Sequence, residues 1–133
     1  MGKRHRAREL ALQILYQLDI RKERSEQILQ EFWEENDAEK DVRNFTNTLV
    51  KGVEEKRLEI DKLLTEFAFN WNLSRMSVID RTILRLGSFE ILFLKEIPPA
   101  VSIDEAIELA KTFGNDNSSK FVNGILNRVK DVK

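Results

Sequence analysis

The sequence predicts an all-α fold of six or seven helices, joined by short loops and packed as bundles. Apolar residues recur at spacings of three and four along most of the chain, which is the period of an amphipathic helix. No segment alternates between apolar and polar residues with period two, and no Asn-Gly turn separates two strand-like runs. The length of 133 residues is that of one ordinary domain, so residues 1–133 are expected to form a single domain.

The first half of the chain predicts three helices. The first has an apolar stripe made by Ala7, Leu10, Ala11, Ile14, Leu15 and Leu18. A short second helix is expected to open at Ser25 and to end in the acidic run 34–37. Apolar positions from Phe45 onward stay on one face when advanced by about 100° per residue, which predicts one long helix over 39–68.

The second half begins with a polar connection at 70–77, followed by a helix to about Leu94. Ser77 is the expected N-cap of this helix, and Asp80 lies in its first turn, where the helix dipole favours an acid. The helix becomes apolar nearly all round, which is typical of a central buried helix. The pair Pro98-Pro99 is expected to stop it.

Two further helices complete the expected fold. Ser102 and Glu105 have the spacing of a capping box, and Gly114 is a natural residue just past the end of that helix. Ser118 or Ser119 is expected to cap the last helix, in which Gly124 predicts the close approach of a neighbouring helix.

The composition leaves little room for catalysis, a metal site or a membrane span. There is no cysteine and only one histidine, so thiolate or histidine metal clusters and Ser-His or Cys-His nucleophilic arrangements are not expected. The close carboxylates Asp104, Glu105 and Glu108 are interpreted as a solvated helix face. Neither a glycine-rich phosphate loop nor a run of about 20 apolar residues is present. We expect a cytoplasmic protein that is not an enzyme and has no cofactor.

The net charge of −1 conceals an uneven distribution. Residues 1–24 carry seven Lys/Arg against three acids, residues 25–41 carry one against seven, and residues 118–133 carry four against one. If the fold brings the two basic ends together, they form a basic face that the total charge does not reveal. The sequence therefore predicts that the two ends converge.

Both basic ends contain an aromatic residue that is predicted to be exposed. Helical geometry puts Tyr16, with His5 and Leu12, on the side of its helix opposite the apolar stripe, between flanking arginines. Phe121 lies about 90° from the centre of the last stripe, beside Lys120 and the outward-pointing amides of residues 118–120, which form a potential anion site. Bases stack on aromatic rings while cations hold phosphates, so this pattern is that of single-stranded RNA binding. The alternative is that both rings simply pack at the edge of the core.

Three blocks carry a resemblance to a known family. These are RHRARELALQILYQLD near the start, IDRTILRLGSFEIL in the middle and SIDEAIELAKTFGNDNSSKFVNGILN near the end. They resemble the bacterial NusB family of transcription antitermination proteins over essentially the full chain. The resemblance implies two small helical bundles and a protein of the antitermination complex that binds boxA RNA of ribosomal RNA leaders. Its implied partners are the single-stranded RNA, the ribosomal protein NusE and, indirectly, other antitermination factors and RNA polymerase.

The resemblance also implies which residues make these contacts. Together with the Ser118 amide at the anion site, the implied RNA contacts are Lys3, Arg4, Arg6, Arg8, Tyr16, Lys120 and Phe121. The implied partner surface is the helix around Asp80, Arg81 and Arg85, where an exposed acid would meet a basic ribosomal protein.

Two alternatives remain open at this point. NusB-like domains also occur ahead of RNA cytosine methyltransferases, although the end of this chain at Lys133 leaves no room for a cofactor-binding domain. A helical adaptor that binds only protein is the other possibility, and RNA binding by the isolated chain distinguishes it from an RNA-binding factor.

Overall fold

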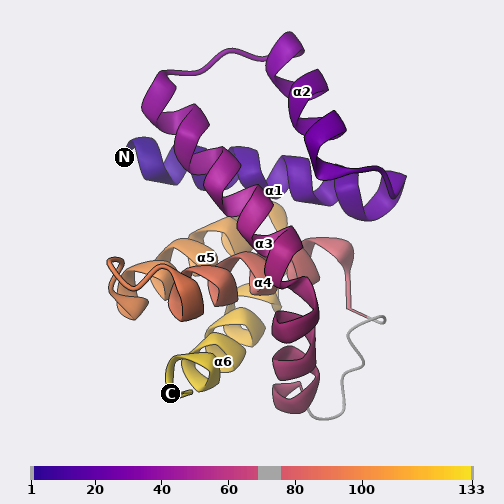
Figure 1. Ribbon diagram of the computed structural model, residues 1–133. Coiled ribbons are helices and arrows are strands. Elements are labelled where there is room, and N and C mark those ends of the chain that lie inside the picture. Colours follow the sequence, from indigo (N-terminus) through magenta and orange to yellow (C-terminus); the bar gives the residue numbers. More distant parts are fainter. Residues whose placement is uncertain (1, 69–75, 133) are drawn as a thin grey trace. The chain divides into compact units, whose positions relative to one another are not determined.

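The computed structural model describes residues 2–68 and 76–132, and within them it contains helices and no strand. The helices in chain order are α1 (Lys3–Arg21), α2 (Ser25–Glu35), α3 (Lys40–Phe67), α4 (Val78–Phe93), α5 (Pro99–Phe113) and α6 (Ser118–Lys130), as Figure 1 shows. The predicted all-α fold is confirmed, and α3 matches the predicted range 39–68 closely. The predicted polar connection falls mostly on residues 70–75, which lie outside the described residues.

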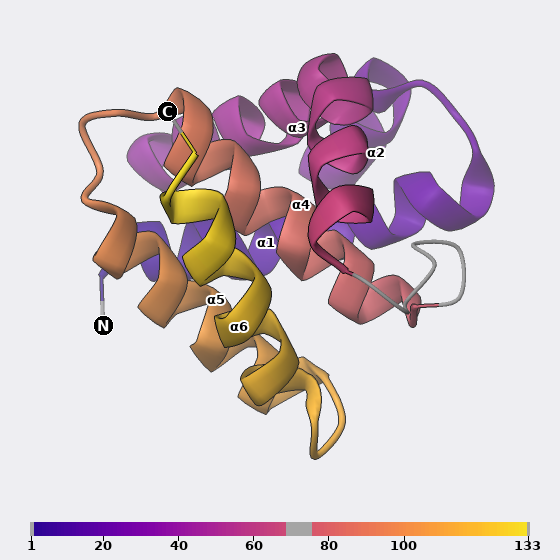
Figure 2. The same ribbon diagram turned by 90° about the horizontal axis from the view of Figure 1, so that it is seen from below.

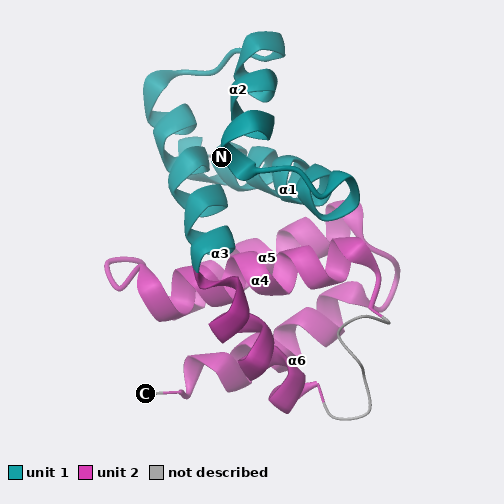
Figure 3. Cartoon of the chain, turned by 45° about the vertical axis from the view of Figure 1, so that its right-hand side comes forward, with its two compact units in different colours: residues 1–55 teal, residues 56–133 magenta. Residues whose placement is uncertain are grey.

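The chain divides into two compact units, residues 1–55 and residues 56–133 (Figure 3). The division falls inside α3, so this helix supplies its first half to unit 1 and its second half to unit 2.

Unit 1 consists of α1, α2 and the first half of α3. The predicted apolar stripe of α1 is buried along its whole length, because its residues recur on one helix face. Polar contacts join the three helices: Thr46 Oγ1 on α3 donates to the Ala7 carbonyl oxygen on α1 at 3.4 Å, and Trp33 Nε1 on α2 donates to Asn47 Oδ1 on α3 at 2.8 Å. The first bond ties α1 to α3, and the second ties α2 to α3.

Unit 2 is built on α4, which is buried on nearly every side, as expected for a helix that becomes apolar nearly all round toward its end. Helices α5 and α6 lie side by side against it (Figure 2). The contact is closest at Gly87, where an added Cβ would lie 2.7 Å from Leu126 Cδ1 on α6 and 3.6 Å from Ala106 Cβ on α5. Glycine at this position therefore lets three helices meet.

Gly124, in contrast, corrects a prediction. It is exposed, and no atom of residues 2–68 and 76–132 outside its own helix lies within 4 Å of a Cβ built there, so none of the described helices packs against it. The sequence expectation was wrong because a mid-helix glycine looks the same whether it faces a neighbour or solvent.

The two glycines give a matched pair of substitutions with opposite expected effects. Gly124→Ala should raise the free energy of unfolding by about 1 kcal/mol, the difference in helix propensity between the two residues. Gly87→Ala should lower it, because overpacking costs about 1–3 kcal/mol and Leu126 is fully buried with little room to move. Urea titrations of both variants measure the two changes, and a similar gain in both would contradict the packing described for Gly87.

The predicted cap of α4 and the predicted start of α2 at Ser25 are confirmed, whereas the predicted capping box at the start of α5 is not. Ser77 is the N-cap of α4, and its Oγ accepts a hydrogen bond from the Asp80 N–H at 3.1 Å. Ser25 is the first residue of α2, whose N-cap is Arg24 and has no side-chain bond. Ser102 lies inside α5, which already begins at Pro99 because the fixed φ of proline suits a first helical position. The Ser102 hydroxyl is buried and donates instead to Glu90 Oε1 at 2.8 Å.

The turn between α5 and α6 is held by Ser118, which is the first residue of α6 and not its cap. Its Oγ accepts from the Asn115 N–H at 3.0 Å, while Asn117 occupies the N-cap position without a side-chain bond. Gly114 follows α5 as predicted, but its φ of −94° is not left-handed. Glycine is required there because a Cβ would lie 2.5 Å from the Ser118 hydroxyl oxygen.

Candidate nucleic-acid interface

The predicted RNA contacts at the start of α1 begin with Lys3, whose side chain is 59% exposed. Its ammonium nitrogen lies 3.1 Å from Glu39 Oε2 and 3.4 Å from Asp41 Oδ2. These carboxylates raise the pKa of Lys3, chiefly through the hydrogen bond with Glu39. Lys3 is therefore charged at neutral pH, and a phosphate that binds it must compete with two acids.

Arg4 and Arg8 both face the ring of Phe45, a residue on α3 that the sequence interpretation had not connected with them. The guanidinium carbon of Arg4 lies 4.4 Å from the ring centroid, and that of Arg8 lies 5.6 Å away. Arg4 remains exposed, but Arg8 is only 4% exposed. The expectation that Arg8 faces outward is therefore wrong, because Arg8, one helical turn after Arg4, faces the Phe45 ring and is buried there.

Arg6 and Tyr16 are exposed, as predicted. The Arg6 side chain is 58% exposed, with its guanidinium 3.4 Å from Glu9 Oε1, and Tyr16 is 37% exposed. Leu12, which was expected on the same outer side, is 2% exposed and belongs to the core. The buried face of α1 is therefore wider than its six-residue stripe. The exposed face, which contains Tyr16, is correspondingly narrower than predicted.

The start of α6 carries the other predicted contacts. Ser118 is 1% exposed, Lys120 is exposed and Phe121 is half-buried. The Ser118 N–H donates to the Asn115 carbonyl at 3.1 Å, so it is not available to an anion. Within the described residues, the Ser119 and Lys120 amides make no hydrogen bond, as expected for the first turn of a helix. The potential anion site thus rests on residues 119 and 120.

The predicted partner surface on α4 is less exposed than expected. Asp80 is 9% exposed and Arg85 is 7% exposed, whereas Arg81 is half-buried and donates to the Met76 carbonyl at 3.3 Å. The expectation that Asp80 is an exposed acid is wrong, because the first turn of α4 turns its third residue inward. As a partner surface, these residues remain a prediction from the family resemblance.

Arg85 has a structural partner that sequence reasoning missed. Asp61 on α3 accepts from Arg85 Nε at 2.8 Å and from Nη2 at 2.9 Å, which is a bidentate ion pair. The two residues are 24 positions apart, and no local pattern links them.

The described residues contain no group of three or more His, Asp or Glu side chains that is arranged to hold a metal ion. None of the helices in the described ranges is long and apolar enough to cross a membrane.

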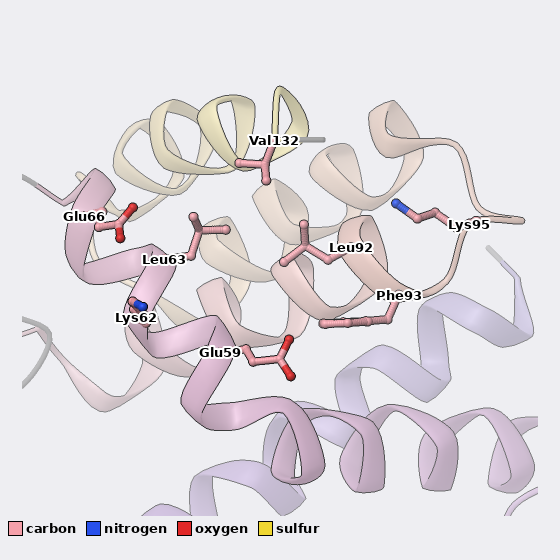
Figure 4. Close-up of a pocket in the computed structure, with 8 residues that line it drawn as sticks. All are labelled: Glu59, Lys62, Leu63, Glu66, Leu92, Phe93, Lys95 and Val132. Atoms are coloured by element: carbon pink, nitrogen blue, oxygen red, sulfur yellow. The ribbon is translucent and has the colours of Figure 1, made fainter.

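A cavity of about 320 Å³ in unit 2 lies between the second half of α3, the end of α4 and the end of the chain, and none of the predicted contact residues lines it. Figure 4 shows Leu63, Leu92 and Val132 pointing toward its centre, with Glu59 and Lys95 near its edge. Its four charged lining residues are two acids and two lysines, so it has no excess of positive charge to attract phosphate.

Comparison with known proteins gives one family. A sequence model described as the NusB family matches residues 5–131. The transcription antitermination protein NusB of Myxococcus xanthus is 48% identical over 133 residues, covering 97% of this chain and 95% of that protein. The protein of the same description from Saccharopolyspora erythraea is 44% identical, covering 99% and 89%.

Solved structures give the same result. NusB of T. maritima has a TM-score of 0.89 at 43% identity, covering 96% of this chain and 89% of that one. A crystal structure of antitermination factors NusB and NusE in complex with double-stranded RNA also has a TM-score of 0.89, at 30% identity and with coverage of 98% and 97%. The chain therefore belongs to the NusB family.

Proposed function

We propose that this chain is a transcription antitermination factor that binds boxA RNA of ribosomal RNA leaders together with the ribosomal protein NusE. It acts in the cytoplasm, by binding and without catalysis, as part of an antitermination complex with RNA polymerase. The observation that carries the proposal is the match over 98% of the chain to a NusB that has been crystallised with NusE and RNA.

The side chains of this chain support the RNA part of the proposal. Lys3, Arg4, Arg6 and Lys120 are exposed cations that can contact phosphates, and Tyr16 and Phe121 are accessible rings on which bases can stack. Arg8 and Ser118 are buried, so we expect them to hold the contact residues in position. Arg8 does so by packing against Phe45, and Ser118 by accepting a hydrogen bond in the turn before α6. The proposed contacts on α1 belong to unit 1, and those on α6 belong to unit 2.

A titration of the chain with fluorescently labelled boxA-like RNA and with scrambled RNA, each with and without NusE, tests the function. We expect NusE to increase the affinity for the boxA-like RNA more than for the scrambled RNA. A duplex of the same boxA-like sequence, used as competitor, tests whether the single strand is preferred. Equal affinity for boxA-like and scrambled RNA, with and without NusE, would refute the proposal.

The convergence of the two basic ends stays a prediction. Spin labels on cysteines introduced at Gly2 and Asn123, next to the two proposed contact regions, are expected to give a short and narrow distance distribution by pulsed electron resonance. Their introduction is straightforward because the chain has no native cysteine. Labels that report the two positions on opposite sides of the molecule would exclude a single RNA path over both ends.

The partner surface around Asp80, Arg81 and Arg85 belongs to the same proposal. Asp80→Asn removes the charge while keeping the size of the side chain, and we expect it to weaken NusE binding more than it lowers the melting temperature. Calorimetric titration with NusE and thermal unfolding of the same variant give the two numbers. If unfolding is the more affected of the two, Asp80 serves the first turn of α4 and not the partner.

A further inference from the structure

A second cavity, of about 400 Å³, lies in unit 1 between α1 and α2. Its size is within the usual range for ligand sites, but its lining differs from most of them because Phe32 is the only apolar member. The lining residues are Gln13, Gln17, Arg21, Glu31, Phe32, Glu35 and Asn36. Such a lining recognises hydrogen-bonding groups and offers little surface for apolar burial.

Two side chains in this lining have unused hydrogen-bonding capacity. Gln13 is exposed and Gln17 is half-buried, and neither amide makes a hydrogen bond within the part of the chain that the structure describes. Arg21, in contrast, is engaged by Glu31 at 3.2 Å and by Glu23 at 2.9 Å. The ion pair with Glu31 connects α1 to α2 within the same lining.

The cavity lies next to one of the proposed stacking rings. Gln13 is three residues before Tyr16 on α1, a spacing that puts Cβ atoms about 5–6 Å apart on one helix surface. Gln17 is four residues beyond Gln13, on the side of α1 that faces the cavity. A base stacked on Tyr16 would therefore present its edge to the Gln13 amide at the mouth of the cavity.

The charge of the lining decides which part of a nucleotide fits. Glu31 and Glu35 are acids, and Arg21 is already paired, so a phosphate is repelled. A base edge with an exocyclic amino group fits the same lining, because carboxylate and amide oxygens accept from an amino group while an amide N–H donates to the adjacent ring nitrogen. Uracil has no such amino group.

From this arrangement we infer that the α1–α2 cavity reads the edge of one amino-bearing base of the bound RNA, through Gln13 and Gln17, while that base stacks on Tyr16. The inference rests on the proposed function, and it assigns sequence preference to residues that contact no phosphate.

The test combines base analogues with protein variants in the presence of NusE. Each amino-bearing base of the boxA-like RNA is replaced singly by an analogue that lacks the amino group: purine riboside for adenosine, inosine for guanosine and 2-pyrimidinone riboside for cytidine. One replacement is expected to weaken binding to the unmodified protein by about five- to tenfold, near the lower end of what a good base contact contributes. The same replacement should weaken binding to the Gln13→Ala/Gln17→Ala variant by less than about twofold.

Gln30→Ala is the matched control, because Gln30 is an exposed glutamine on α2 that does not line the cavity, and it should respond as the unmodified protein does. Helix content and thermal unfolding show whether the double variant is folded, and alanine at two positions of α1 favours the helix. If every analogue weakens binding equally in both proteins, or if none weakens binding to the unmodified protein, the inference is wrong while preference for boxA over scrambled RNA can persist. Loss of that preference in the unmodified protein overturns the proposed function itself.

Discussion

Asp61→Ala is expected to lower the free energy of unfolding by about 3 kcal/mol, near the lower end of the cost of breaking a buried ion pair. The Arg85 side chain is 8% exposed, and Asp61 holds it by two short hydrogen bonds from the neighbouring helix. Without the carboxylate, a guanidinium stays inside unit 2 with its bidentate partner gone. For a chain of this length the change corresponds to a fall in melting temperature of roughly 10 °C, which thermal unfolding measures directly.

Two controls distinguish the loss of this ion pair from a general effect of removing charge on the free energy of unfolding. Glu66→Ala removes an exposed acid from the same helix and should change the free energy of unfolding by less than about 0.5 kcal/mol. Replacing both partners, as Asp61→Leu with Arg85→Leu, should recover most of the loss, because the buried guanidinium is then removed as well, and Arg57, which pairs with Asp61 at 3.8 Å, is partly exposed. A single Asp61→Ala variant as stable as the Glu66→Ala control would show that the pair contributes nothing to stability.

Phe121→Ala is expected to weaken RNA binding by about 1–3 kcal/mol, the usual contribution of one base–aromatic stack. The salt dependence of binding should stay nearly unchanged, because stacking releases no counterions. The Phe121 side chain is half-buried at the start of α6, next in sequence to residues 119 and 120, whose amides make no hydrogen bond within the described residues. In the proposed RNA complex, the base and the phosphate of one nucleotide arrive there together, which would account for a large aromatic so near the charged end of a helix.

Lys120→Ala is the matched comparison, since it removes charge from the adjacent exposed position. It should make the plot of log affinity against log salt concentration shallower by about 0.7, the value for one phosphate on a single strand. If Phe121 instead fills the core, its truncation costs roughly 3–5 kcal/mol of stability. A strongly destabilised Phe121→Ala protein whose folded fraction binds RNA normally would refute the stacking role.

The sequence by itself determined the helices and the family. Apolar residues at the helical period identified the α1 stripe, the long α3 and the buried α4, because this period depends only on the geometry of one helix. Ser77 was recognisable as a cap for the same reason, since its partner Asp80 lies only three residues away. The three motif blocks led to the NusB family, which the full-length comparisons show.

The tertiary structure decided which residues of each helix are accessible and which partners they have. Arg8 and Leu12 are buried although both lie off the α1 stripe, and Gly87, not Gly124, is the glycine at a close helix contact. The Asp61–Arg85 pair and the approach of Phe45 to Arg4 join residues far apart in the chain. Helical periodicity gives the direction of a side chain within its own helix, but burial and pairing depend on what the other helices place there, and a single sequence read locally does not contain that information.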